Sequence, residues 1–206
     1  MRNRGLFVAI LIAALFAALP GAFAAEQAKT LDNLQAAFNG ESNANAKYLA
    51  FAQKAQEEGY GEVASLFRAA ARAEEVHLKG HAAVIKKMGA EPKADIKTPE
   101  VKSTKENLQA AIEGETYEKT TMYPEFITVA KAEKNEDALR SFRYAKTAEA
   151  EHARLYGEAL KNLDSLKGSK AKDFYVCRIC GYTVTVVDFT NCPSCGYPKE
   201  EYEKVS

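Results

Sequence analysis

Glu74-Glu75-Val76-His77 and Glu149-Ala150-Glu151-His152 each place a glutamate three residues before a histidine. Residues three apart share one face of a helix, so each copy directs a carboxylate and an imidazole to the same point. Each copy also follows a predicted helix that carries a glutamate inside its apolar stripe, Glu41 or Glu115. This combination predicts a four-helix bundle with a carboxylate-bridged dimetal centre.

The two halves of the chain are related by an internal repeat. Residues 33–42 (NLQAAFNGES) align without gaps with residues 107–116 (NLQAAIEGET) at an offset of 74, and the two Glu-x-x-His copies lie 75 residues apart. One repeat of this length predicts a duplicated helical hairpin rather than a solenoid. The repeat breaks at Glu118, which corresponds to Ala44, so only the second half offers an extra carboxylate.

Apolar periodicity predicts four long helices with a tight turn inside each half of the repeat. Gly59-Tyr60-Gly61 and Lys134-Asn135 interrupt the periodicity and mark these turns. Pro124 falls inside the third helix and predicts a kink or an irregular turn there. The expected helices span about residues 31–58, 62–88, 103 onward and 136–166.

The two halves are joined by residues 89–102, which contain two prolines and lack helical periodicity. Fully extended, this connection could reach about 46 Å, which is about the length of a 28-residue helix. It is therefore long enough to cross over along the bundle, and it could equally pass to a second subunit. Ser103-Thr104-Lys105-Glu106 has the form of a capping box and predicts the start of the third helix.

The inward-facing acids carry the functional hypothesis. Any single glutamate of this chain is best interpreted as a solvated helix charge, but the set lies on apolar stripes. Burying an uncompensated carboxylate costs several kcal/mol, so several together require cations or protons. Two histidines on the same faces favour a dimetal site, and this ligand type suits iron or manganese. The expected ligands of the bundle site are Glu41, Glu74, His77, Glu115, Glu149 and His152.

Three further side chains lie near these positions. His81 has no counterpart in the second repeat, where Tyr156 stands, so we expect it behind the ligands or at the surface rather than on the metal. Tyr48 and Tyr123 are interpreted as core aromatic residues. A hydrogen bond from either hydroxyl group to a ligand carboxylate is a testable addition.

Composition excludes one class of function and the N-terminus predicts export. The 206 residues contain 28 basic and 28 acidic side chains, which argues against a nucleic-acid binder. Residues 1–24 combine a basic start, an apolar stretch from Leu6 to Leu19 and the cleavage motif Ala22-Phe23-Ala24, as in a secretory signal peptide. The apolar stretch is shorter than the roughly 20 residues that span a bilayer, although an uncleaved anchor is the alternative. We therefore expect a periplasmic or otherwise exported protein.

The residues after the polar linker 168–172 lose the helical pattern, and they contain all four cysteines. Disulfides are the general expectation for an exported protein with an even number of cysteines. Two Cys-x-x-Cys knuckles, each followed by glycine, instead favour a tetrahedral four-thiolate metal site, and glycine lets backbone amides turn toward the sulfurs. Zinc and a single iron both fit this spacing. The expected ligands are Cys177, Cys180, Cys192 and Cys195.

From about residue 30 to its end, the chain resembles the rubrerythrins. The resemblance implies a mainly α protein with a ferritin-like four-helix bundle at residues 25–167, followed by a small rubredoxin-like four-cysteine metal domain at residues 168–206. Its motifs are Gly40-Glu41-Ser42 with Tyr48, Glu74-x-x-His77, Gly114-Glu115-x-x-Glu118 with Met122-Tyr123-Pro124, Glu149-x-x-His152, and the short gap from Cys180 to Cys192.

The resemblance implies a non-haem diiron peroxidase that reduces hydrogen peroxide to water in oxidative-stress defence. A rubredoxin-like iron would return electrons to the bundle, since iron between four thiolates cycles by one electron and zinc does not. Glu118 would be a switchable ligand that exchanges with His77 as the redox state changes. The implied bridging ligands are Glu74 and Glu149, and the implied outer ligands are Glu41, Glu115, His77 and His152.

Export departs from the usual cytoplasmic location of rubrerythrins, so we expect an exported electron donor instead of a nicotinamide-dependent reductase. We also expect a homodimer. One alternative function is a ferritin-like ferroxidase or iron store, which leaves the four-cysteine tail unexplained. Another is a binding module in which both metals are zinc.

Overall fold

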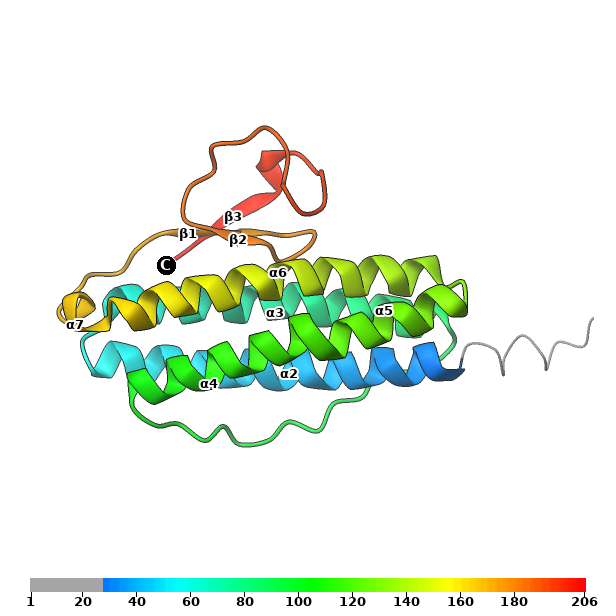
Figure 1. Ribbon diagram of the computed structural model, residues 1–206, viewed down its shortest axis with the longest axis horizontal. Coiled ribbons are helices and arrows are strands. Elements are labelled where there is room, and N and C mark those ends of the chain that lie inside the picture. The colour runs from blue at the N-terminus through cyan, green and yellow to red at the C-terminus, as the bar shows by residue number, and fades with distance from the viewer. Residues whose placement is uncertain (1–27) are drawn as a thin grey trace, which may run out of the picture.

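The computed structural model describes residues 28–206, where four long helical segments form an antiparallel bundle beneath a C-terminal tail (Figure 1). This architecture confirms the predicted mainly α, ferritin-like bundle with a four-cysteine tail. The predicted signal peptide lies outside the described residues, and none of the described helices is long and apolar enough to cross a membrane. The helices are α2 (Ala28–Glu57), α3 (Gly61–Lys87), α4 (Thr104–Tyr117), η1 (Glu118–Met122), α5 (Tyr123–Ala132), α6 (Glu136–Lys161) and α7 (Leu163–Leu166).

The helix ends lie close to the positions that the sequence predicts. Gly59 closes the first turn with φ +76°, a left-handed conformation that favours glycine. Ser103 and Glu106 form both bonds of the predicted capping box. The side chain of Asn135 caps α6 by accepting from the amide of Ala138. One boundary differs, because the last predicted helix is interrupted at Asn162, which separates α6 from α7.

The third helical segment does not end at Pro124. Residues 118–122 widen into the π-helical segment η1, and α5 continues directly from it with Pro124 in its first turn. Proline cannot donate the i→i−4 hydrogen bond, and its ring clashes with the carbonyl one turn earlier. The wider turn accommodates this conflict without a break, and Glu118 begins it.

The connection between the halves crosses over along α2 within the same chain (Figure 1). Polar side chains at successive turns of α2, Gln35, Asn39 and Asn43, pair with the backbone of the connection. Asn43 donates to the carbonyl of Asp95 at 3.0 Å and accepts from the amide of Lys97 at 2.8 Å. Gln35 makes the same kind of pair with residues 91 and 93. These bonds satisfy backbone groups that have no helical partners.

The bundle core consists of two apolar clusters with the acids between them. One cluster contains Tyr48, Phe67 and Tyr156, and the other contains Leu34 and Phe142. Along each long helical segment, the predicted ligands stand where the side chains change from one cluster to the other. Both apolar ends therefore shield the polar layer from solvent.

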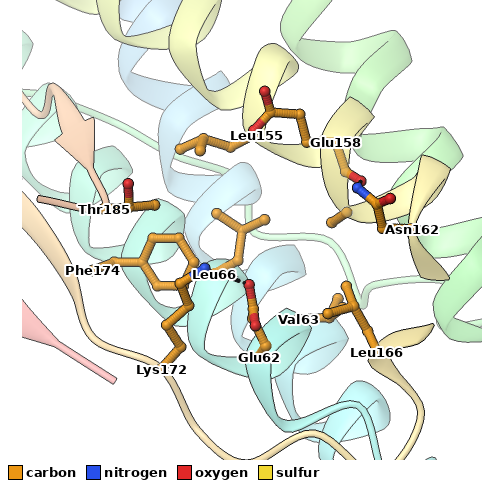
Figure 2. Close-up of a pocket in the computed structure, with 11 residues that line it drawn as sticks. Glu62, Val63, Leu66, Leu155, Glu158, Asn162, Leu166, Lys172, Phe174 and Thr185 are labelled. Carbon is orange, nitrogen blue, oxygen red and sulfur yellow. Dashed lines mark hydrogen bonds and ion pairs between the residues drawn. The ribbon is translucent and has the colours of Figure 1, made fainter.

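The tail forms a small antiparallel sheet in the order β2-β1-β3, packed over α3 and α6 (Figure 1). Its strands are β1 (Phe174–Cys177), β2 (Thr183–Val184) and β3 (Tyr202–Val205), with a 3-10 turn η2 (Lys199–Glu201) before β3. Phe174 and Val176 enter the same apolar cluster as Tyr48, so the sheet shares a core with the bundle. A cavity of about 190 Å³ lies beside this junction. Lys172 donates to Glu62 at 2.6 Å, and Figure 2 shows both among the residues that line the cavity.

Candidate metal centres

The six predicted bundle ligands meet in the buried layer between the apolar clusters. One group of ligand atoms comes from Glu41, Glu74, His77 and Glu149, and a second comes from Glu74, Glu115, Glu149 and His152. Within each group, the atoms lie within 4.8 Å of one another, and all six residues are buried. Glu74 and Glu149 belong to both groups, so they stand where two neighbouring cations would share ligands.

Both histidines present the same ring nitrogen to the acids. The Nδ1 atom of His77 lies 2.8 Å from Glu74 Oε2 and 3.0 Å from Glu149 Oε1, whereas its Nε2 atom lies 3.1 Å from the carbonyl oxygen of Cys180. A carbonyl oxygen only accepts, so Nε2 carries a proton and Nδ1 is the ring nitrogen that can bind a cation once it has lost its own proton.

His152 is held in the same way from the tail. Its Nδ1 lies 2.9 Å from Glu149 Oε2, and its Nε2 lies 3.1 Å from the hydroxyl oxygen of Thr183. That hydroxyl donates to the carbonyl of Gly181, so it accepts from the ring. The four-cysteine tail therefore fixes the orientation and the tautomer of both histidines.

Two tyrosines support the outer acids. Tyr48 donates to Glu115 Oε1 at 2.6 Å, and Tyr123 donates to Glu41 Oε1. Both rings are buried core residues, so the sequence interpretation was correct, and the added hydrogen bonds are present as well. Each bond is made to Oε1, the oxygen that also lies within 4 Å of a histidine Nδ1, and leaves Oε2 buried without a hydrogen-bond partner.

His81 is not a member of either ligand group, and the alternative of a surface position is wrong because the ring is fully buried. Its Nε2 lies 3.1 Å from the Tyr123 hydroxyl and its Nδ1 lies 2.8 Å from the Ser141 hydroxyl. Burial lowers the pKa of His81 to about 3, so the ring is neutral at pH 7.

The polar layer fits a pair of cations. Among the described residues, the buried side-chain atoms without a hydrogen-bond partner include Glu41 Oε2, Glu115 Oε2, both oxygens of Glu149 and Nδ1 of His152. Burial and the neighbouring Glu74 raise the pKa of Glu41, and burial with Glu149 and Glu74 raises the pKa of Glu115 to about 8. Buried carboxylates of this kind need a positive charge, and carboxylate with imidazole is a donor set for iron.

The tail brings its four cysteines together as the spacing predicts. All four are free, which excludes the disulfide alternative in this structure, and their sulfur atoms lie within 4.8 Å of one another. The Sγ atoms of Cys177 and Cys195, and those of Cys180 and Cys192, are 3.7 Å apart. A tetrahedral site with metal–sulfur bonds of about 2.3 Å has sulfur–sulfur edges of about 3.8 Å, so the cluster fits one metal.

Glycine gives the two knuckles the same geometry. Gly181 and Gly196 each adopt φ +75°, and their amides donate to the carbonyls of Cys177 and Cys192. Backbone amides approach the sulfurs, and those of Tyr182 at Cys180 and Tyr197 at Cys195 each directly follow one of these glycines. The expected role of glycine in turning amides toward the sulfurs agrees with this arrangement.

Comparison with known proteins agrees with this geometry. The family model described as Rubrerythrin matches residues 32–160. The chain belongs to the rubrerythrin family. Proteins of this family are diiron oxidoreductases, so the acid–histidine layer is the family's diiron site and the tail holds a four-cysteine metal site.

Individual relatives cover most of both chains. Nigerythrin from Nitratidesulfovibrio vulgaris is 42% identical over 84% of this chain and 85% of its own length. Rubrerythrin-2 from Clostridium acetobutylicum is 33% identical over 86% and 97%. The structure of fully reduced, all-ferrous nigerythrin has a TM-score of 0.78 at 40% identity, covering 85% of this chain and 86% of that one. A bacterioferritin from Desulfovibrio desulfuricans, with a TM-score of 0.67 at 21% identity over 73% and 93%, shows the shared fold alone.

The rubrerythrin tail contributes site residues that sequence reasoning missed. The carbonyl of Cys180 and the hydroxyl of Thr183 hold the two histidines, and Gly181 lies so close that a Cβ atom there would be 2.2 Å from His77 Nε2. A backbone carbonyl has no sequence signal. The glycine was singled out for its knuckle, but only the fold reveals its contact with His77.

We expect metal binding by this rubrerythrin site to release protons and to strengthen as pH rises from about 7 to 10. Burial alone would lower the pKa of His77, but Glu149 and Glu74 outweigh it and raise the pKa to about 10. Together with Glu115, whose pKa is about 8, the metal-free layer holds protons that ligands must lose. Calorimetric titration with Zn²⁺ of protein whose four-cysteine site is already loaded, in two buffers of different ionisation enthalpy, measures this release. Equal apparent enthalpies in both buffers would contradict the expectation.

Proposed function

We propose that this protein is a non-haem diiron peroxidase that reduces hydrogen peroxide to water and receives electrons through its four-cysteine site. The proposal follows the family's diiron, oxidoreductase character and adds a substrate and an electron route. The observation that carries it is the direct contact between the two metal sites. Cys180, a predicted ligand of one site, accepts a hydrogen bond from His77, a predicted ligand of the other.

The contact favours electron relay over iron storage. The ferritin-like alternative accounts for the bundle, but it gives no reason for a four-cysteine tail to hold both histidines. In the bundle, two bound irons would supply the two electrons that peroxide needs. In the tail, a single bound iron would return electrons to the bundle one at a time. The buried position of the layer excludes bulk water, and the tyrosines keep Glu41 and Glu115 in place.

Residue roles follow from position in the two groups. Glu74 and Glu149, which belong to both groups, would bridge the metals. Glu41 and His77 would hold one metal, while Glu115 and His152 would hold the other. Cys177, Cys180, Cys192 and Cys195 would hold the tail iron.

We expect Glu118→Ala to retain two irons in the bundle and to slow turnover. Glu118 is partly buried at the start of η1 and belongs to neither ligand group, and π-helical segments frequently mark functional sites. Burial and the nearby Glu115 raise its pKa, so it stands beside the acids as an additional carboxylate. Metal analysis and steady-state peroxide consumption measure the two effects. Loss of both irons would assign Glu118 a structural role instead.

We expect Cys177→Ser to abolish turnover supported by an external reductant, yet to spare one reaction of prereduced protein with peroxide. The substitution removes one of four thiolates from the tail but leaves the acids and histidines unchanged. Steady-state and single-turnover rates of the same preparation provide the comparison. An unimpaired steady state would refute electron relay through the tail.

The proposed substrate is tested by stopped-flow mixing of the reduced protein with hydrogen peroxide or with dioxygen. Rapid stoichiometric oxidation by peroxide supports the proposal, whereas slow reaction with peroxide and fast reaction with dioxygen contradicts it. Metal analysis of anaerobically purified protein should give about three irons per chain. Zinc in the tail would remove the electron relay from the proposal.

We further propose that the protein is exported, acts as a homodimer and receives electrons from an exported donor. Residues 1–24 motivate the first point, because they have the pattern of a cleavable signal peptide. Intact mass of protein from the periplasmic fraction should correspond to a chain that begins at Ala25. A full-length chain in the cytoplasmic fraction would refute export, and a monomeric mass by light scattering would refute the dimer.

A further inference from the structure

A tyrosine hydroxyl group reaches the four-cysteine site from an edge strand of the tail sheet. Tyr202 begins β3, and its hydroxyl group donates to the sulfur of Cys192 at 3.1 Å. Cys192 is buried, and the ring of Tyr202 packs against the cluster that it forms with Cys177 and Cys180. The site therefore receives a side-chain hydrogen bond in addition to the backbone amides that approach its sulfurs.

The register of the sheet positions this tyrosine. Tyr202 stands directly opposite Cys177 in the antiparallel pair of β1 and β3 (Figure 1). Opposite residues of such a pair point to the same face, so the ring lies on the face where Cys177 holds its sulfur. The alternate residues, Val176 on β1 and Val205 on β3, pack instead against the bundle core. The fold thus directs Tyr202 at the cysteines rather than at the core.

Packing does not require the hydroxyl group of Tyr202. The ring contacts Phe189, with the two ring centroids 5.2 Å apart, and a phenylalanine at position 202 would keep this contact. Only the oxygen of the tyrosine meets the sulfur. A hydrogen bond is stronger when its acceptor is charged, so this bond gains strength as negative charge accumulates on the sulfur of Cys192.

We propose that Tyr202 is a positioning residue that raises the reduction potential of the four-cysteine site through its hydrogen bond to Cys192. The inference rests on the proposed function, in which the site carries one electron at a time from an exported donor to the bundle. Uptake of one electron, which converts ferric to ferrous iron, adds one negative charge to the iron and its four thiolates, while Tyr202 keeps its proton. The added charge strengthens the bond, so the hydroxyl group stabilises the reduced form and lets a weaker reductant fill the site.

The reduction potential of the tail tests this role. In full-length protein whose four-cysteine site is reconstituted with iron, spectroelectrochemical titration followed at the thiolate-to-iron absorption gives the midpoint potential. Tyr202→Phe should lower the equilibrium constant for one-electron reduction by about tenfold, which is a decrease of about 59 mV. A midpoint potential equal to or higher than that of the wild-type protein would overturn the inference.

Tyr175→Phe is the matched control for this measurement. Tyr175 lies on β1 in the same sheet, and in the described part of the chain its hydroxyl group meets no cysteine sulfur. The control should keep the wild-type potential. An equal decrease in Tyr175→Phe and Tyr202→Phe would trace the effect to the sheet and refute a specific role of Tyr202.

The absorption spectrum separates the hydrogen bond from a change in packing. A sulfur that loses a hydrogen bond gives up electron density more readily, so oxidised Tyr202→Phe should show thiolate-to-iron bands at lower energy with the same iron content. Bands at the wild-type energy would show that the hydroxyl group does not act on Cys192, against the inference. Neither the potential nor the spectrum involves peroxide, so a protein that fails to react with peroxide would refute the proposed function and leave both readouts decisive for Tyr202.

Discussion

Gly181→Ala should slow electron transfer from the tail to the bundle by at least about tenfold while both sets of metal ligands stay complete. A Cβ atom at this position would lie 2.2 Å from His77 Nε2, which is far inside van der Waals contact. The knuckle must therefore move away from α3, and the hydrogen bond from His77 to the Cys180 carbonyl is lost. Stopped-flow reduction of oxidised protein, followed at the thiolate-to-iron absorption and at the bundle iron, measures the transfer.

Gly196→Ala is the matched control. Gly196 stands at the same place in the other knuckle and has the same φ of +75°, but nothing lies within 4 Å of an added Cβ atom. Both variants bear the left-handed strain of a non-glycine residue, about 1 kcal/mol. An equal loss of transfer in the two variants would trace the effect to knuckle strain. Normal transfer in Gly181→Ala would show that the contact with His77 is not the route.

The bundle and its ligand set could be predicted because both depend on the spacing of residues that are close together in the sequence. Glu74 and His77 share a helix face whatever the rest of the chain does, and the apolar stripe around them sets which face is inward. The internal repeat then predicts a second Glu-x-x-His pair that faces the first one. The four-cysteine cluster could be predicted equally well, since each knuckle is a local turn with two residues between its ligands.

The contacts between the two sites could not be predicted in this way. Thr183 meets His152 only because β2 lies over α6, which is a property of tertiary packing. Strands β1 and β3 have four residues each, too few for a clear alternating pattern, and neither was expected. The sequence predicts only an irregularity near Pro124 and not the π-helical segment after Tyr117. Proline shows that regular helical hydrogen bonding must be disturbed, but it does not show which backbone conformation replaces it.

Glu115→Gln should change the stability of the metal-free and the metal-loaded protein in opposite directions. The carboxyl group of Glu115 is fully buried, and burial with the nearby Glu149 and Glu74 raises its pKa to about 8. Glutamine keeps an oxygen for the Tyr48 hydroxyl and removes the ionisable group. The free energy of unfolding of the metal-free protein should therefore rise by on the order of a few kcal/mol at pH 9.

The pH dependence gives the sign of this effect. In the unfolded chain the carboxyl group ionises near the usual glutamate pKa of 4.5, whereas in the fold it stays protonated up to about pH 8. Between these values the folded state binds more protons, so wild-type stability falls as pH rises through this window. The increase in the free energy of unfolding that Glu115→Gln causes should be absent near pH 4 and complete above pH 8. Urea unfolding of metal-free protein at several pH values measures it.

With metal bound, the wild-type protein should be stabilised more than Glu115→Gln, because the amide that replaces the carboxylate cannot neutralise a cation. Stabilisation by a bound metal grows with its affinity, so Glu115→Gln should show a smaller rise in Tm on addition of Fe²⁺ under anaerobic conditions. Glu113→Gln is the control, since Glu113 lies exposed on the same helix and should leave both measurements unchanged. If Glu115→Gln destabilises the metal-free protein at pH 9, the acids are neutralised by something other than the metals. If it leaves the metal-induced rise intact, Glu115 is not a ligand.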